Sequence, residues 1–172
     1  MNDAVVPVER QIVASLPRLR RFARTLTRNA HDADDLVQIA VERALLRIDQ
    51  WRVDTSLLSW LFGILRNAWI DEVRASRRRG HLFVAEEVGE HVGQSTMDRA
   101  TDLLSIQAAL ERLPDEQRLA VGLVLVEGLS YKEAATIMDV PIGTLTSRLA
   151  RGRLALESML KDTPGPRPAG AE

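Results

Sequence analysis

Residues 128–153 read GLSYKEAATIMDVPIGTLTSRLARGR, and this stretch decides how the C-terminal part of the chain should fold. Ser130 and Glu133 have the spacing of a capping box, in which each side chain satisfies a backbone N–H group at the start of a helix. Pro141 suits the first turn of a second helix, because its missing N–H group would have no helical partner there. The stretch therefore predicts two helices joined by a tight turn, the helix-turn-helix arrangement.

The second of these helices has two unlike faces. Ile142, Leu145 and Leu149 are predicted to be buried. The opposite face carries small hydroxyl and basic side chains, which are Thr144, Thr146, Ser147, Arg148 and Arg151. Hydroxyl groups can read base edges and arginines can bind guanine or phosphate, so this face favours a helix that enters the major groove. An ordinary amphipathic helix pair has the same pattern, and the pattern alone leaves both interpretations open. Gly152 costs about 1 kcal/mol relative to alanine inside such a helix, and the sequence offers no reason for it.

Apolar residues recur at helical spacing in five further segments, which are residues 8–27, 32–48, 56–78, 98–113 and 116–127. Pro17 interrupts the first of them and predicts either a kink or a later start. Residues 80–97 are dotted with glycine and acidic, which predicts a flexible linker, and residues 162–172 have nothing to bury and should be disordered. We therefore expect an all-α fold of two small helical domains, residues 8–79 and 98–161.

The composition narrows the class of protein. The chain has no cysteine, which excludes a disulfide framework and a thiolate metal site. It has no apolar run long enough to cross a bilayer and no pattern of a signal peptide, so we expect a cytoplasmic protein without membrane insertion. The net charge of −1 hides an uneven distribution, because residues 1–80 are basic on balance while residues 81–97 contain three glutamates and no lysine or arginine. Separate basic faces on the two predicted domains fit nucleic acid.

The N-terminal domain carries two charged features with competing interpretations. Asp34, Asp35 and Gln38 form a ridge that could meet a basic partner helix, or the carboxylates could simply stabilise the positive end of the helix dipole. Basic side chains cluster at the end of the segment 56–78, and they could bind phosphates or form a solvated helix end. This cluster consists of Arg74, Arg77, Arg78 and Arg79.

Residues 128–153, together with the preceding LERLPDEQR at 110–118, closely resemble region 4 of extracytoplasmic-function sigma factors. DADDLVQ at 32–38 resembles sigma region 2.2, and SWLF at 59–62 with the residues up to 74 resembles regions 2.3 and 2.4. The resemblance covers nearly all of residues 8–160 in the right order. It implies that residues 8–79 form the region 2 domain and residues 98–161 the region 4 domain of a transcription initiation factor.

The resemblance also implies a role for each surface. The ridge of Asp34, Asp35 and Gln38 would dock on the clamp helices of the β′ subunit of RNA polymerase. The −10 promoter element would be bound by Arg66, Asn67, Arg74, Arg77 and Arg78, with Asn67 at a base edge and residues 50–57 near the pocket. The −35 element would be bound by Thr144, Thr146, Ser147, Arg148, Ala150 and Arg151.

At four positions the chain departs from the family pattern. Ile39 stands where the family usually has glutamate, and Leu45 where tryptophan is frequent. Thr146 and Ala150 stand where some members have an arginine and an aromatic residue. The −35 sequence that this chain reads therefore cannot be transferred from those members. Among the tryptophans, Trp60 is predicted to be core, and the sequence leaves Trp51 and Trp69 open.

The expected partners are core RNA polymerase, promoter DNA and an anti-sigma factor, with no cofactor, metal or small-molecule substrate. No catalytic residue is predicted, because the three histidines lack metal-ligand spacing and no nucleophile motif is present. His81 and His91 with the nearby glutamates leave a weak metal-binding alternative. A one-component repressor would explain only the helix-turn-helix. The more serious rival is a sigma-like decoy that sequesters an anti-sigma factor without initiating transcription, although such modules usually come with a receiver domain.

Overall fold

The computed structural model describes residues 7–80 and 105–161, and every regular element in these ranges is helical. The N-terminal half contains α1 (Val8–Leu26), α2 (Ala30–Leu46), the short 3-10 helix η1 (Ile48–Gln50) and α3 (Leu57–Gly80). The C-terminal half contains α5 (Asp115–Val121), the π-helical turn η2 (Gly122–Val126), α6 (Tyr131–Met138) and α7 (Ile142–Lys161), preceded by a helical stretch at 105–111. The prediction of an all-α fold is confirmed for the described residues. The predicted linker falls largely outside them, and the predicted tail entirely so.

Local sequence signals mark the starts of two helices, α2 and α6. Asn29 begins α2 by accepting a hydrogen bond from the Asp32 N–H group at 2.8 Å. The capping box that the sequence predicts at the start of α6 is present, with both Ser130 and Glu133 contributing. Pro17 does not end α1 and does not mark a later start, since the helix runs through it from Val8 to Leu26.

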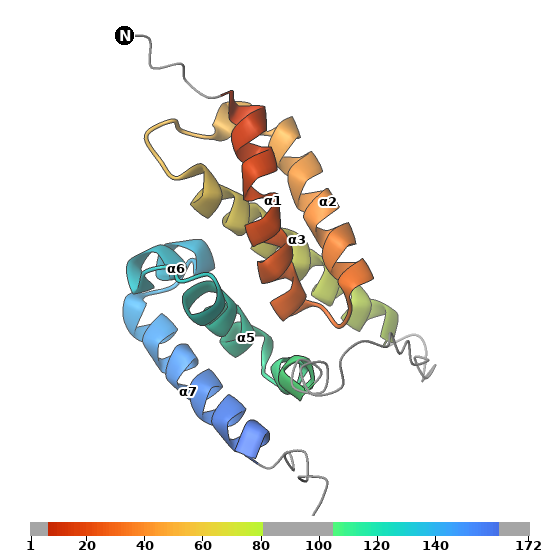
Figure 1. The fold of residues 1–172 in the computed structure, drawn as a ribbon, viewed down its shortest axis with the longest axis vertical. Coiled ribbons are helices and arrows are strands. Elements are labelled where there is room, and N and C mark those ends of the chain that lie inside the picture. The colour runs from red at the N-terminus through yellow and green to blue at the C-terminus, as the bar shows by residue number, and fades with distance from the viewer. Residues whose placement is uncertain (1–6, 81–104, 162–172) are drawn as a thin grey trace, which may run out of the picture.

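The N-terminal half is a three-helix bundle in which α1, α2 and α3 contact one another in pairs (Figure 1). Its centre is the pair Phe22 on α1 and Phe62 on α3, both fully buried, with ring centroids 5.2 Å apart in an edge-to-face arrangement. Trp69 is buried beside them and donates its indole N–H to the Leu26 carbonyl at 3.1 Å. Trp69 is therefore a core residue, a role that the sequence had left open.

The C-terminal half packs α7 across α5 and α6, with Leu123, Leu145 and Leu149 at its centre. Periodicity predicted one of the three apolar positions on α7 wrongly. Ile142 is 50% exposed at the first turn of α7, whereas Leu145 and Leu149 are buried. Spacing identifies the apolar face of a helix, but it does not tell how far along that face the neighbouring helix reaches.

Gly152 has a structural reason that the sequence did not reveal. A β-carbon at this position would lie 2.9 Å from Cγ2 of Val121 and 3.4 Å from the backbone oxygen of Gln117. Glycine therefore lets α7 approach α5 more closely than any other residue would allow.

The two halves lie against each other (Figure 1). Helix α3 contacts α6, and α1 contacts both η2 and α5. The sequence predicted the two bundles but gave no indication of this interface.

Candidate nucleic-acid interface

The acidic ridge on α2 is exposed. Asp34 and Asp35 keep 54% and 58% of their side-chain surface, and Gln38 is exposed one turn further on. Their contacts are local: Asp34 lies 3.2 Å from Arg20, and Gln38 donates to Glu42 at 2.9 Å. Exposed pairs of this kind contribute little to stability, so a partner can displace them at small cost.

Helix α3 carries the residues predicted to bind the −10 element from its middle to its C-terminal end. Asn67 is exposed and accepts a hydrogen bond from the Arg66 guanidinium at 3.3 Å. Arg66 is half-buried, and its Nε atom has no partner among the described residues. Burial lowers the pKa of the Arg66 guanidinium, an effect that nearby Arg148 and Arg74 reinforce and Asp139 opposes.

The basic end of α3 contains exposed arginines and arginines that pair with carboxylates. Arg74 and Arg78 are exposed. Arg77 contacts Asp115 of the C-terminal half at 2.6 Å, and Arg79 contacts Glu72 of its own helix at 3.1 Å. DNA phosphates would have to compete with these carboxylates for two members of the cluster.

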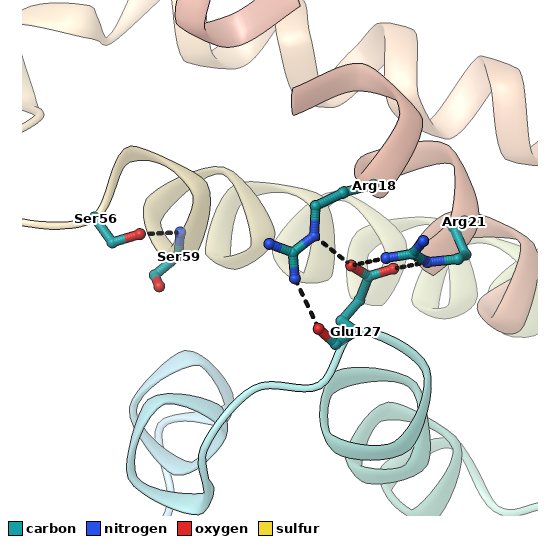
Figure 2. A network of polar contacts seen from close by, with 5 residues as sticks. All are labelled: Arg18, Arg21, Ser56, Ser59 and Glu127. Carbon is teal, nitrogen blue, oxygen red and sulfur yellow. Dashed lines mark hydrogen bonds and ion pairs between the residues drawn. The ribbon is translucent and has the colours of Figure 1, made fainter. Parts of the chain in front are cut away.

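The loop before α3 is held by its own polar groups. Arg52 and Asp54 form an ion pair at 2.8 Å, and the Trp51 indole N–H donates to the Thr55 carbonyl at 3.3 Å. Ser56 caps α3 by accepting from the N–H group of Ser59 at 3.2 Å (Figure 2). Trp60 is half-buried against the core, in agreement with the role predicted for it.

In the helix-turn-helix, α6 leads into α7 through Asp139, whose left-handed backbone (φ 53°) makes the tight turn. The hydrogen bonds from the Ser130 side chain and backbone lower the pKa of the Glu133 carboxyl, so the capping box is strongest with Glu133 ionised. This local structure fixes the angle at which α7 leaves the turn.

The predicted −35 face of α7 is mostly open. Its exposed members are Thr146, Ser147, Ala150 and Arg151, while Thr144 is half-buried. The hydroxyls of Thr146 and Ser147 donate to the carbonyls of Ile142 and Thr144, each at 2.9 Å, so their free lone pairs point away as acceptors. Arg148 is only 21% exposed and bonds Glu116 at 2.6 Å. Sequence analysis placed Arg148 on the free face and missed this pairing, since Glu116 lies on another helix.

Sequence analysis also missed a buried carboxylate between the two halves. The side chain of Glu127 has no exposed surface and lies between Arg18 and Arg21 of α1 (Figure 2). These partners lie 109 and 106 positions away in the sequence, and no local signal pairs residues at that distance.

Within residues 7–80 and 105–161, no three His, Asp or Glu side chains are grouped to hold a metal ion. The same ranges contain no helix that is long and apolar enough to cross a membrane. The weak metal alternative at His81 and His91 lies outside the described residues.

Two family models match this chain in sequence. The Sigma-70 region 2 model matches residues 12–79, and the Sigma-70 region 4 model matches residues 103–156. The ECF RNA polymerase sigma factor EcfG of Rhodopseudomonas palustris is 39% identical over 149 residues, which cover 87% of this chain and 82% of that protein. This chain belongs to the ECF RNA polymerase sigma factors. The resemblance stated from the sequence motifs is thereby confirmed.

Further ECF sigma factors and solved structures agree. SigM of Mycobacterium tuberculosis is 37% identical, over 83% of this chain and 71% of that protein. The sigma factor RpoE of Bartonella quintana, solved with the anti-sigma factor NepR, matches with a TM-score of 0.77 and 33% identity over 91% of this chain and 98% of that one. CnrH, solved with the cytosolic domain of CnrY, is 22% identical with a TM-score of 0.69, which shows a shared fold.

Proposed function

We propose that this ECF sigma factor works as a binding protein that positions core RNA polymerase on a promoter, in the cytoplasm, and that it contributes no catalytic residue. The observation that carries the proposal is the pair of sigma regions, each with an exposed polar face of the chemistry that its partner requires. Region 2 would provide residues 8–79, region 4 would provide residues 98–161, and residues 80–97 would link them.

On region 2, we propose that the ridge of Asp34, Asp35 and Gln38 docks on the β′ clamp helices, because its exposed carboxylates complement a basic helix. Next to it, Asn67 is placed to hydrogen-bond the edge of an unstacked base, and the half-buried Arg66 supports it. The exposed Arg74 and Arg78, together with Arg77, would bind phosphates without reading sequence.

On region 4, Thr146, Ser147 and Ala150 would face base edges, with Thr144 at the start of the helix. Arg148 and Arg151 would bind guanine or phosphate. Since Thr146 and Ala150 are small, the base pairs opposite them would be read by short acceptors and methyl contacts.

An anti-sigma factor would control this protein. RpoE of Bartonella quintana, which matches along nearly its whole length, was solved with its anti-sigma factor NepR. We expect a partner of that type to hold the two regions of this chain away from polymerase and DNA.

Run-off transcription with purified core polymerase on fragmented genomic DNA tests the proposed function. We expect transcripts that start at a common promoter sequence and depend on this protein. Tight binding of an anti-sigma factor without any initiation would instead identify a decoy and would overturn the proposal.

Asn67→Ala is expected to slow promoter opening about ten-fold or more while core binding stays within about two-fold. A lost base-edge hydrogen bond costs about 1–3 kcal/mol of discrimination, and Asn67 does not lie in the docking ridge. Permanganate footprinting of the −10 region measures opening, and fluorescence anisotropy with labelled core measures binding. Equal losses in both assays would contradict the base-contacting role of Asn67.

Arg151→Ala is expected to weaken binding to −35 DNA about ten-fold and to reduce the slope of log affinity against log salt by about 1, as for one lost phosphate contact. Arg151 is exposed and its loss leaves no buried group unpaired. Electrophoretic mobility shifts at several salt concentrations provide the measurement. The exposed Arg47 lies outside every proposed contact, so Arg47→Ala serves as the control. An unchanged salt slope for Arg151→Ala would remove it from the interface.

A further inference from the structure

The closed arrangement of the two regions cannot bind a whole promoter. Elements near −10 and −35 are separated by about 25 base pairs, or about 85 Å of B-form DNA at about 3.4 Å per step. In the structure α3 contacts α6, and α6 contacts α7, so α3 and α7 are separated by about two helix diameters, roughly 20 Å. The two regions must therefore part before both elements can be read.

Glu127 holds the two regions together. Its Oε1 lies 2.8 Å from Nε of Arg21, and its Oε2 lies 2.9 Å from Nε of Arg18 and 3.0 Å from Nη2 of Arg21. The Arg18 guanidinium also donates to the backbone carbonyl of Glu127 at 2.7 Å (Figure 2). The Glu127 carboxylate has no exposed surface, whereas the side chains of Arg18 and Arg21 keep 38% and 54% of theirs. Removal of the negative charge would therefore leave a buried polar group that no longer attracts the two arginines.

At Gly122 the backbone of the C-terminal half lies close to α1. A β-carbon there would lie 2.7 Å from Oγ1 of Thr25 and 2.8 Å from Cε2 of Phe22, both on α1. Thr25 and Phe22 are buried and the Phe22 ring is packed on Phe62, so these atoms have little room to move. A side chain on Gly122 would be accommodated most easily by separation of region 4 from α1.

Polar contacts complete the interface on the side of α5. Arg118 donates to the Leu26 carbonyl at 3.1 Å, and Gln107 donates to the Thr27 carbonyl at 2.6 Å. Arg77, a proposed phosphate ligand, is occupied by Asp115. In the closed arrangement Arg77 is therefore paired with Asp115 and less available to bind a promoter phosphate.

The ridge on α2 stays exposed in the closed arrangement, with Asp34, Asp35 and Gln38 all at the surface. Core polymerase can therefore bind the closed protein through region 2, and separation of the regions can follow.

From these contacts we propose that the free protein inhibits its own promoter binding, and that Glu127 in the socket of Arg18 and Arg21 is the latch of this closed state. The latch stays shut until polymerase and promoter DNA together supply more binding free energy than it does. This inference rests on the proposed function, since it concerns the DNA surfaces assigned there.

Small-angle X-ray scattering of the full chain, without polymerase or DNA, tests the latch. We expect the wild-type radius of gyration to match the closed structure. Glu127→Gln keeps the size of the side chain but removes its charge, and it should raise the ratio of open to closed protein about ten-fold or more. Glu157→Gln removes an exposed carboxylate from the same region and should leave the scattering unchanged. An extended wild type, or superimposable curves for Glu127→Gln and the wild type, would overturn the latch.

Gly122→Ala provides a second test that does not depend on charge. Gly122 has ordinary helical dihedral angles, so alanine fits region 4 itself, and only α1 obstructs it. We expect opening comparable to that of Glu127→Gln, with the circular dichroism of a folded protein. Gly143→Ala is the matched control, since no atom lies within 4 Å of the added carbon. A closed Gly122→Ala variant would contradict the proposed interface.

The inhibitory role is measured by the affinity of the free protein for a duplex that carries both promoter elements. Opened variants should bind at least five-fold more tightly than the wild type. Opening without any gain in affinity would overturn self-inhibition. Variants that open and gain affinity while none of the proteins, including the wild type, initiates transcription would uphold the latch and refute the proposed function instead.

Discussion

Gly152→Val is expected to lower the free energy of unfolding of region 4 by about 3 kcal/mol, which would leave little of the stability of so small a unit. The β-carbon would overlap Cγ2 of Val121 and press on the backbone of Gln117, and Val121 is itself buried. Gly152→Ala should destabilise region 4 less, because alanine has a better helix propensity than glycine, and this gain of about 1 kcal/mol offsets part of the overpacking cost. Valine adds two further methyl groups and a β-branch, and its gain in helix propensity over glycine is only a few tenths of a kcal/mol.

Urea titration followed by circular dichroism measures this loss, and its control is Gly143→Val. Both glycines lie on α7, but no atom is within 4 Å of a β-carbon on Gly143. Gly143→Val should change stability only through helix propensity, in which valine is better than glycine by a few tenths of a kcal/mol, so we expect no loss or a small gain. Equal losses at the two positions would show that the contact between α7 and α5 at Gly152 does not limit stability.

Gly152 also shows where sequence reasoning stops. Its cost inside a helix can be predicted from one sequence, but its benefit comes from Gln117 and Val121 on another helix. By contrast, the capping box at Ser130 and Glu133 was predictable because both partners lie within one turn. The sequence thus predicted what is local, and the all-α fold followed from it.

The same distinction applies to the candidate surfaces. The sequence pattern placed Asp35 on an acidic ridge and Arg151 on the polar face of its helix, and both residues are exposed. Asn67, named from the family resemblance, is exposed as well. The pattern could not predict that Arg148 bonds Glu116, since nothing near Arg148 in the sequence indicates a partner. Neither could it predict the burial of Glu127, which requires the approach of α1 from the other half of the chain.

The charged groups of the latch and those of the ridge on α2 differ in burial and in what they contribute to the fold. In the latch, the carboxylate of Glu127 is fully buried, and its hydrogen bond and charge raise the pKa of the Arg21 guanidinium. On the ridge, the carboxylates of Asp34 and Asp35 form only solvent-exposed pairs, with Arg20 and His31, and another molecule can displace these pairs at little cost. The proposed polymerase-binding surface is therefore the ridge on α2, whose charges contribute little to the stability of the fold.

Asp35→Lys is therefore expected to weaken binding to core polymerase about 100-fold or more with little change in stability. The substitution removes an attraction and places a like charge against the proposed basic helix of β′, an arrangement that costs several kcal/mol. Within residues 7–80 and 105–161, Asp35 forms an exposed ion pair with His31 at 3.5 Å, and the loss of such a pair costs little stability. Fluorescence anisotropy with labelled sigma factor measures the affinity for core, and thermal unfolding measures stability.

The matched control is Asp49→Lys. Asp49 is an exposed acid in η1, just past the C-terminal end of α2 and outside the ridge, and its substitution makes the same change in net charge. If Asp49→Lys reduced affinity as much as Asp35→Lys, the effect would be a general one of net charge, and the ridge would not be the docking site. A large loss for Asp35→Lys with normal affinity of the isolated protein for −35 DNA would place the defect at the polymerase contact, because the region 4 surface lies on other helices.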